Sequence, residues 1–272
     1  MDKRFIVLID FSDYSDNMVR YAYNWSRQAE AKLLLLHQVA VVAPAMADST
    51  TRASIAMHAR TRAFQKLKAL IHSNVPDNEE VQLSVVETDL KYTLAKLVAE
   101  PYDQLIFLSL KGTGLLKQLF MGSVAIDVIE NANALVAAIP KNIPYFSPRK
   151  LFIAVSDKHP LNISALEKLM QFIPGHVDMI IFFHLAKGNE DTASVAEELE
   201  KLSWRFSAIC PTQHAIYHDK NAFEDMRAMV LNKNEELLVL QKGSRLFVDQ
   251  LFRKFLVNEL VYQGEIPLLV LP

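Results

Sequence analysis

The sequence predicts an α/β protein made of two doubly wound domains, each with a five-stranded parallel sheet. Three observations support this prediction: apolar runs alternate with amphipathic segments, the order of these runs repeats, and a proline-rich stretch separates the two copies. Strand–helix alternation forms parallel sheets with helices on both faces. Right-handed crossovers then make each copy doubly wound. The length of 272 residues suits two domains of ordinary size.

In the first copy, short apolar runs predict strands and longer periodic segments predict helices. Ser12 is the expected cap of the first helix, since a hydroxyl at the cap and the following acids Asp13 and Asp16 suit a helix N-terminus. The predicted strands span residues 4–10, 33–39, 81–87, 104–109 and 134–139, and the predicted helices lie near 14–30, 50–73, 90–99 and 123–132.

The second copy repeats the order of the first and is shorter. Met179–Phe183 is apolar on both faces, as a strand covered by helices on both sides should be. The predicted strands span 150–156, 177–185, 212–218, 236–240 and 267–271, and the helices lie near 160–172, 191–208, 221–231 and 247–262. The matching segments are Lys3–Asp10 with Arg149–Ser156, Leu105–Gly112 with Leu237–Ser244, and Leu135–Pro140 with Pro267–Pro272.

Pro140, Pro144 and Pro148 mark the boundary between the copies, because closely spaced prolines stop a helix and stiffen an extended connector. The expected domains are therefore residues 1–141 and 149–272, joined by a linker at 142–148.

Composition narrows the range of functions. The net charge of −2 gives no sign of a surface for nucleic acid or for an anionic membrane, so neither is an expected partner. No apolar stretch is long enough for a signal-peptide core or a membrane span, which favours a cytoplasmic protein. The single cysteine, Cys210, excludes an internal disulfide framework and a cysteine-rich zinc site. A buried apolar role for Cys210 is favoured over a reactive thiol.

Three segments of the first copy are expected to meet at one edge of its sheet, because doubly wound sheets bind ligands at the carboxyl ends of their strands. They are Asp10 after the first strand, His37–Gln38 at the end of the second, and the glycine-containing loop 109–123 after the fourth. Glycines let the backbone approach a ligand closely, and a helix N-terminus presents free N–H groups to an anion. A strand-end packing role is favoured for His37 over that of a base. The sequence contains no P-loop motif, no dinucleotide-binding glycine motif after the first strand and no nucleophile elbow.

The combination of Val7-Leu-Ile-Asp10-Phe-Ser12, Leu36-His37-Gln38-Val39 and Ser109-x2-Gly112-x9-Gly122-Ser123 resembles the universal stress protein family. The order of strands extends the resemblance over both copies, as a tandem member with the adenine-nucleotide alpha-hydrolase-like fold. The resemblance implies ATP binding in the first copy with little or no hydrolysis, and Mg²⁺ or Mn²⁺ held mainly by phosphates and water. It implies that Asp10 and the backbone of Gln38 hold the adenine and ribose, and that Ser109, Gly112, Gly122, Ser123 and the N–H of Val124 surround the phosphates.

The second copy lacks these residues and is expected to bind no cofactor. Ser156 replaces the acid, Ser244 replaces the loop glycine, and Lys254-Phe255 replaces the glycine–serine pair. In the family, the last strands of two domains pair, so Leu135–Ile139 and Pro267–Leu271 are expected to join within the chain as a pseudo-dimer, which would cover two sheet edges. A further homodimer of chains stays open.

Two functions remain open from sequence. The first is a stress-response regulatory protein that binds ATP or a related adenine nucleotide and is not an enzyme. The second is a nucleotide-free scaffold or chaperone-like interaction protein, which is favoured by Ser109, by Gln38 and by the altered second copy. A slow ATPase is a weaker third reading, because no residue pair resembles a water-activating base and its orienting partner. No metal-binding residues are expected.

Overall fold

The computed structural model describes residues 1–41, 44–109, 123–140, 143, 145–156, 159–173, 175, 177–186, 190–218, 235–243 and 266–272. In chain order the elements are β1 (Asp2–Leu8), α1 (Ser15–Ala29), β2 (Ala31–Gln38), α2 (Ser49–Asn74), β3 (Val81–Val86), α3 (Leu90–Val98), β4 (Tyr102–Ser109), α4 (Ser123–Asn131), β5 (Leu135–Ile139), β6 (Lys150–Ala154), α5 (Ile163–Phe172), β7 (Met179–Ala186), α6 (Ala193–Phe206), β8 (Thr212–His218), β9 (Glu236–Gln241) and β10 (Leu268–Leu271).

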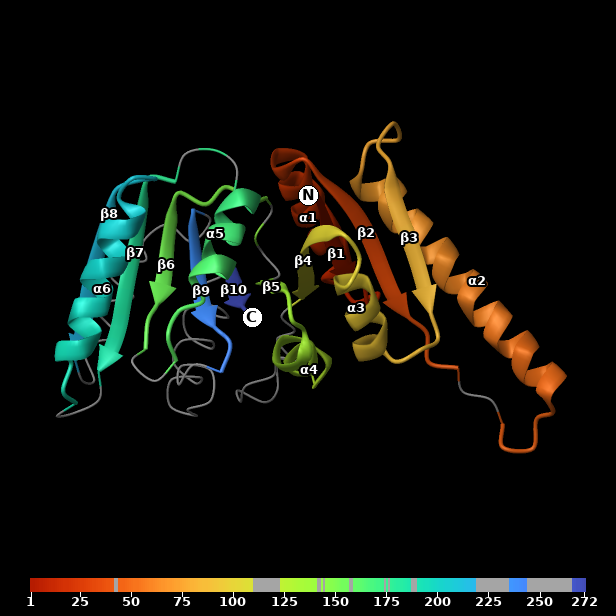
Figure 1. The fold of residues 1–272 in the computed structure, drawn as a ribbon. Helices are drawn as coiled ribbons and strands as arrows, with labels where there is room; N and C mark the ends of the chain where they lie inside the picture. The colour runs from red at the N-terminus through yellow and green to blue at the C-terminus, as the bar shows by residue number, and fades with distance from the viewer. Residues whose placement is uncertain are drawn as a thin grey trace.

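The ten described strands form one sheet in the order β3-β2-β1-β4-β5-β10-β9-β6-β7-β8 (Figure 1). All neighbouring strands are parallel except β5 and β10, which pair antiparallel with Ala137 opposite Leu269. The expected pairing of these two strands is therefore present. Each half contributes five neighbouring strands, and the chain is an α/β protein with a mostly parallel sheet.

Every predicted strand is present, and its ends differ from the prediction by a few residues at most. The expected helices at 221–231 and 247–262 lie outside the described residues. The prediction that Ser12 caps the first helix is wrong, because α1 begins at Ser15 after a tight turn in which Ser15 N donates to Ser12 O at 2.9 Å. The side chain of Ser12 bonds to Asp10 instead.

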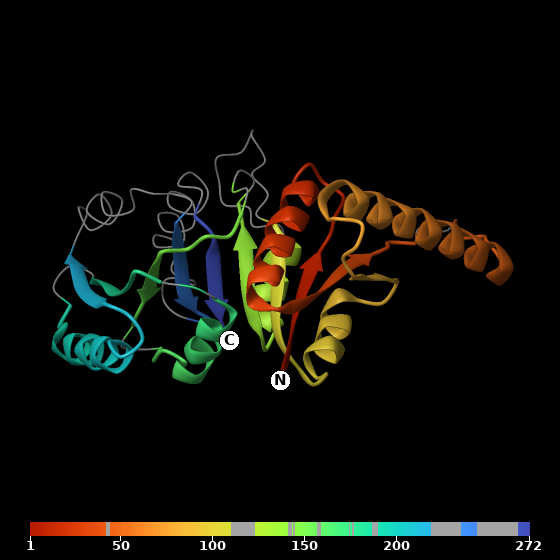
Figure 2. The ribbon, with the colours of Figure 1, turned by 90° about the horizontal axis from the view of Figure 1, so that it is seen from above.

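The described helices cover both faces of the sheet (Figure 2). One apolar cluster joins α1, α2, α5 and α6 to one face, and a second joins α3 and α4 to the other. Strands between two helical layers have no solvent-facing side, which explains why the middle of β4 is apolar without alternation. Within the described part of the chain, no helix has the length and apolar character that crossing a membrane requires.

The two halves share a core where α1 meets α5 and the segment 145–148. Trp25 of α1 is fully buried, stacks on Phe146 with ring centroids 3.7 Å apart, and donates its indole N–H to Phe172 O at 2.6 Å. Phe5 of β1 lies 5.8 Å from Phe172 between ring centroids. The connecting segment is therefore packed against the first half, rather than lying free in solvent.

Twist of the sheet changes the side of the molecule that the carboxyl ends of its strands face. The strands of the second half run opposite to β5 where the halves join. In Figure 1, however, the arrows of β2, β3, β6 and β7 point the same way. Twist of roughly 20° per strand accumulates over several strands into such a reversal. The carboxyl ends of these outer strands therefore face one side of the molecule.

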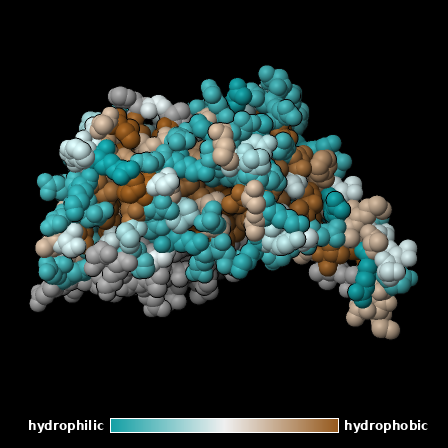
Figure 3. Space-filling view, in the orientation of Figure 1, coloured by the Kyte–Doolittle hydropathy of each residue, from teal (hydrophilic) through white to brown (hydrophobic). Residues whose placement is uncertain are grey.

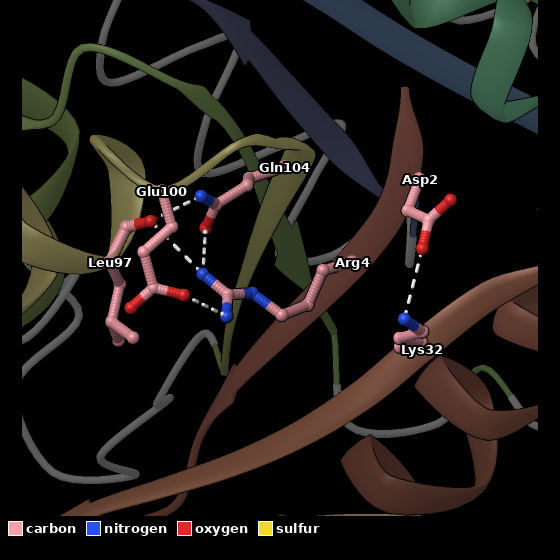
Figure 4. A network of polar contacts seen from close by, with 6 residues as sticks. All are labelled: Asp2, Arg4, Lys32, Leu97, Glu100 and Gln104. Carbon is pink, nitrogen blue, oxygen red and sulfur yellow. Dashed lines mark hydrogen bonds and ion pairs between the residues drawn. The ribbon is translucent and has the colours of Figure 1, made fainter.

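A buried cation anchors the opposite end of β1 (Figure 4). Arg4 is 4% exposed, and its guanidinium donates to Glu100 Oε2 at 2.6 Å, Leu97 O at 3.0 Å and Gln104 Oε1 at 3.1 Å. The guanidinium carbon also lies 4.3 Å from the centroid of the Tyr102 ring. These contacts fix the end of α3 and the start of β4 against β1.

Candidate functional site

Asp10 lies immediately beyond the carboxyl end of β1, and its carboxylate is held by the turn that follows. Asp10 Oδ1 accepts from Ser12 N at 3.0 Å, from Ser12 Oγ at 2.6 Å and from Ser15 Oγ at 3.4 Å. Hydrogen bonds to a carboxylate oxygen fix the orientation of the side chain. The predicted site acid is therefore exposed at the sheet edge and held in place by neighbouring donors.

The residue after Asp10 is held in a strained backbone conformation. Phe11 has φ of 55°, which costs a non-glycine residue on the order of 1 kcal/mol. Its ring packs on His37 of β2 with centroids 4.3 Å apart, and His37 Nδ1 donates to Ile9 O at 2.7 Å. His37 therefore acts as a packing and positioning residue at the strand end, as expected. Strain of this kind persists only where surrounding contacts enforce it.

Gln38 ends β2, next to β1. Ile9 N donates to Leu36 O at 2.9 Å, whereas Val39 N donates to Val86 O on the other side at 2.8 Å. Because successive peptide groups of a strand alternate in direction, the backbone of Gln38 faces the β1 side, where Asp10 lies. The side-chain Nε2 of Gln38 donates to Thr88 O at 3.1 Å.

The third predicted segment follows β4, which pairs with β1 in parallel, so it leaves the sheet at the same edge as Asp10. Ser109 is the last residue of β4 and is half-buried. Helix α4 begins at Ser123, followed by Val124, and its first turn contains no acidic residue. A helix N-terminus carries partial positive charge that favours an anion. Gly112 and Gly122 lie outside the described residues.

The second half reproduces this strand-end arrangement without the acid. Val155 N donates to Phe183 O at 2.8 Å, as Ile9 N does to Leu36 O. His184 Nδ1 donates to Val155 O at 2.8 Å, as His37 does to Ile9. Ser156 therefore stands where Asp10 stands in the first half. The substituted residues Ser244, Lys254 and Phe255 lie outside the described residues.

Sequence reasoning missed three residues of this region: Phe11 and Ser15, which contribute side chains, and Thr88, which contributes its backbone carbonyl. The hydroxyl at Ser15 was detectable, because a serine at this spacing from an acid can reach its carboxylate in a turn. The roles of Phe11 and Thr88 depend on contacts with another strand. Among the described residues, no group of three or more His, Cys, Asp and Glu side chains could hold a metal ion.

Cys210 follows α6 and is 7% exposed. Burial raises the pKa of its thiol, while a hydrogen bond involving the Ile180 backbone opposes the shift. The thiolate is the reactive form, so we expect Cys210 in the folded protein to react with a disulfide reagent much more slowly than in urea. Absorbance of the released thiol measures both rates, and equal rates in the two conditions would contradict a buried thiol.

The fold and the edge residues define a class of protein. It is a doubly wound α/β protein whose candidate ligand site lies at the carboxyl ends of β1, β2 and β4, the position at which such sheets bind ligands. The model of the universal stress protein family matches residues 1–140. The chain therefore belongs to the universal stress protein family, and this membership indicates a stress-response role.

Solved structures share the fold over the whole chain. A universal stress protein from Archaeoglobus fulgidus DSM 4304 is similar with a TM-score of 0.67 and 15% identity, covering 100% of this chain and 99% of that one. A functionally unknown protein from Pseudomonas aeruginosa PAO1 is similar with a TM-score of 0.53 and 13% identity, covering 99% and 92%. Comparison with curated protein sequences gives no significant match.

Proposed function

We propose that the chain is a stress-response regulatory protein that binds ATP or a related adenine nucleotide in its first half, with little or no hydrolysis. The observation that carries this proposal is the placement of Asp10 and the head of α4 at one sheet edge, which follows from the pairing of β1 with β4. An acid can accept hydrogen bonds from a ribose, and the helix head favours phosphate.

The assignment of residues to parts of the nucleotide follows the resemblance to the universal stress protein family, and the positions of Asp10, Gln38 and the start of α4 support it. Asp10 and the backbone of Gln38 would hold the ribose and the base. Ser109, the Ser123 hydroxyl and the N–H of Val124, with Gly112 and Gly122 of the connecting loop, would hold the phosphates. A divalent cation would be bound mainly by phosphate and water. The nucleotide is a regulatory ligand in this proposal, and no residue is assigned to catalysis.

The proposal includes an arrangement of two universal stress protein domains, 1–141 and 149–272, joined by 142–148 as an intramolecular pseudo-dimer. It is supported by the antiparallel pairing of β5 with β10 and by the matching contacts of His37 and His184. The second domain carries Ser156 at the position of Asp10 and serves as a structural partner. A cytoplasmic location is part of the proposal, and homodimerisation of chains is left to measurement.

Thermal unfolding with ATP and Mg²⁺ tests the proposal. A ligand at 100 times its Kd stabilises by about 2.7 kcal/mol, which raises the Tm of a chain this long by roughly 5–10 °C. The double variant Gly122→Lys/Ser123→Phe, which copies the second half, should lose this shift. Ser156→Ala should retain it. An unchanged Tm of the wild type at millimolar ATP would refute nucleotide binding.

A nucleotide-free scaffold is the second candidate function. The side-chain bond from Gln38 to Thr88 O and the serine at position 109 favour it, because neither residue is specialised for a nucleotide. Mass spectrometry of the supernatant from denatured, freshly purified protein separates the two candidates. Stoichiometric adenine nucleotide would discard the scaffold, and its absence, together with no thermal shift, would support it.

A further inference from the structure

We propose that a groove between α2 and the edge strand β3 binds an extended acidic segment of a partner protein, which adds a strand to the sheet. The groove has a volume of about 800 Å³. Met57 and Phe64 of α2 and Leu83 and Val85 of β3 form its apolar walls. Figure 3 shows apolar surface between the sheet and α2. Helix α2 itself extends past β3, as Figures 1 and 2 show.

The backbone of β3 is available for pairing. β3 stands at the end of the strand order, and the described residues place no strand on its outer side. Val86 O accepts from Val39 N on the β2 side, so the alternating peptide groups of Leu83 and Val85 face outward. Edges are normally protected by charged residues or proline, yet the β3 sequence VQLSVV contains neither. An added strand would satisfy these outward groups.

The positive charges of α2 favour an acidic peptide as the occupant of the groove. Helix α2 carries five lysines and arginines and no aspartate or glutamate, although the whole chain has a net charge of −2. One of these cations, Arg60, lines the groove, where its Nε lies 3.7 Å from Oε1 of Glu87, which also lines it. Lys68 lies next to the groove wall, with its Nζ 5.1 Å from the centroid of the Phe64 ring. Carboxylates that flank the apolar strand of a bound peptide would complement the positive charges of Arg60 and Lys68 at the rim of the groove.

Other occupants fit less well. A second copy that paired its β3 antiparallel to this one would place two α2 helices on the same face, where their like charges repel. Nucleic acid offers phosphates to the cations of α2, but it supplies no strand for the open edge and no side chains for the apolar walls. A peptide in β-strand addition uses the edge, the walls and the rim together.

Fluorescence anisotropy with the full chain tests the proposal. The probe is a labelled synthetic peptide of alternating valine and threonine, flanked by pairs of glutamates, and a second peptide carries lysines in place of the glutamates. Ion pairs of its glutamates with Arg60 and Lys68 predict that the acidic peptide binds about fivefold tighter than the lysine peptide. Equal affinity for the two peptides would overturn the assigned chemistry.

Two variants test the two parts of the interface. Val85→Pro removes an outward N–H that β2 does not use, a change tolerated on an edge strand, and should abolish binding. Arg60→Glu/Lys68→Glu should reverse the preference towards the lysine peptide. Lys201→Glu on α6 is the matched control and should bind as wild type does.

Melting temperatures of all variants show which of them are folded. In case Val85→Pro is unfolded, the peptide preference of Arg60→Glu/Lys68→Glu tests the proposal. Wild-type binding by folded Val85→Pro would overturn strand addition. Tighter binding of single-stranded oligonucleotide or phosphatidylserine vesicles than of the acidic peptide would assign the basic helix to another kind of partner and overturn the proposal.

Discussion

Replacement of Trp25 with alanine is expected to lower the free energy of unfolding by about 4 kcal/mol, a large part of the stability of an ordinary domain. Trp25 is fully buried between Phe5, Phe107 and Phe146. The truncation leaves a cavity there and removes the donor to Phe172 O. This carbonyl belongs to the second half, and Phe146 belongs to the connecting segment. The loss of the indole therefore weakens the contact between the halves.

Urea unfolding followed by far-ultraviolet circular dichroism measures the Trp25 effect. Trp25→Phe keeps an aromatic ring, loses the hydrogen bond and should cost about 1–2 kcal/mol. Trp204 is 82% exposed on α6, so Trp204→Ala is the matched control and should change stability by less than about 0.5 kcal/mol. A Trp25→Ala effect as small as that of Trp204→Ala would show that the shared core is not built as described.

The second large effect is expected at the ion pair between Arg4 and Glu100, and it is asymmetric. Glu100→Ala should cost about 3 kcal/mol, because it leaves a buried guanidinium without its carboxylate. Arg4→Leu should cost less, about 1–2 kcal/mol, because the side chain of Glu100 is 44% exposed and can be hydrated when its partner is lost. The remaining loss in Arg4→Leu comes mainly from Gln104, which is buried and loses a donor.

A double-mutant cycle measures the coupling between the two residues. The variant Arg4→Leu/Glu100→Ala should cost less than the sum of the single changes, since the unpaired cation is absent from it. Asp2→Ala breaks the neighbouring exposed pair with Lys32 and should produce no measurable change. Strictly additive single effects would contradict the predicted coupling. None of these variants should alter the thermal shift with ATP, because Arg4 lies at the opposite end of β1 from Asp10.

The sequence was sufficient for the positions of the strands and for the prediction that the segments after β1 and β4 leave the sheet at the same edge. Apolar runs locate buried strands, and parallel pairing then brings their carboxyl ends to one edge. Local hydrogen bonds determine where α1 begins, and the sequence pattern does not predict this correctly. Ser12 resembles a cap in sequence, yet its hydroxyl bonds to Asp10 and the helix begins at Ser15. Side-chain competition of this kind depends on turn geometry that composition does not contain.

Long-range contacts could not be predicted for a different reason. The stacking of Trp25 on Phe146 and the bonds of Arg4 to Glu100 join residues about a hundred positions apart in the chain. No periodicity relates such positions, so only the assembled sheet reveals them. The open edge at β3 is similar: its sequence reads as an ordinary strand, and its lack of an outer neighbour follows from the order of all the described strands.

The twist of the sheet has a consequence for the surface that the chain offers to other proteins. Because the ends of β2, β3, β6 and β7 face one side, a protein approaching from that side meets both halves at once (Figure 1). If the first half takes up nucleotide as proposed and the second does not, such a protein meets a surface that changes beside one that does not. A lone five-stranded unit offers no such internal reference.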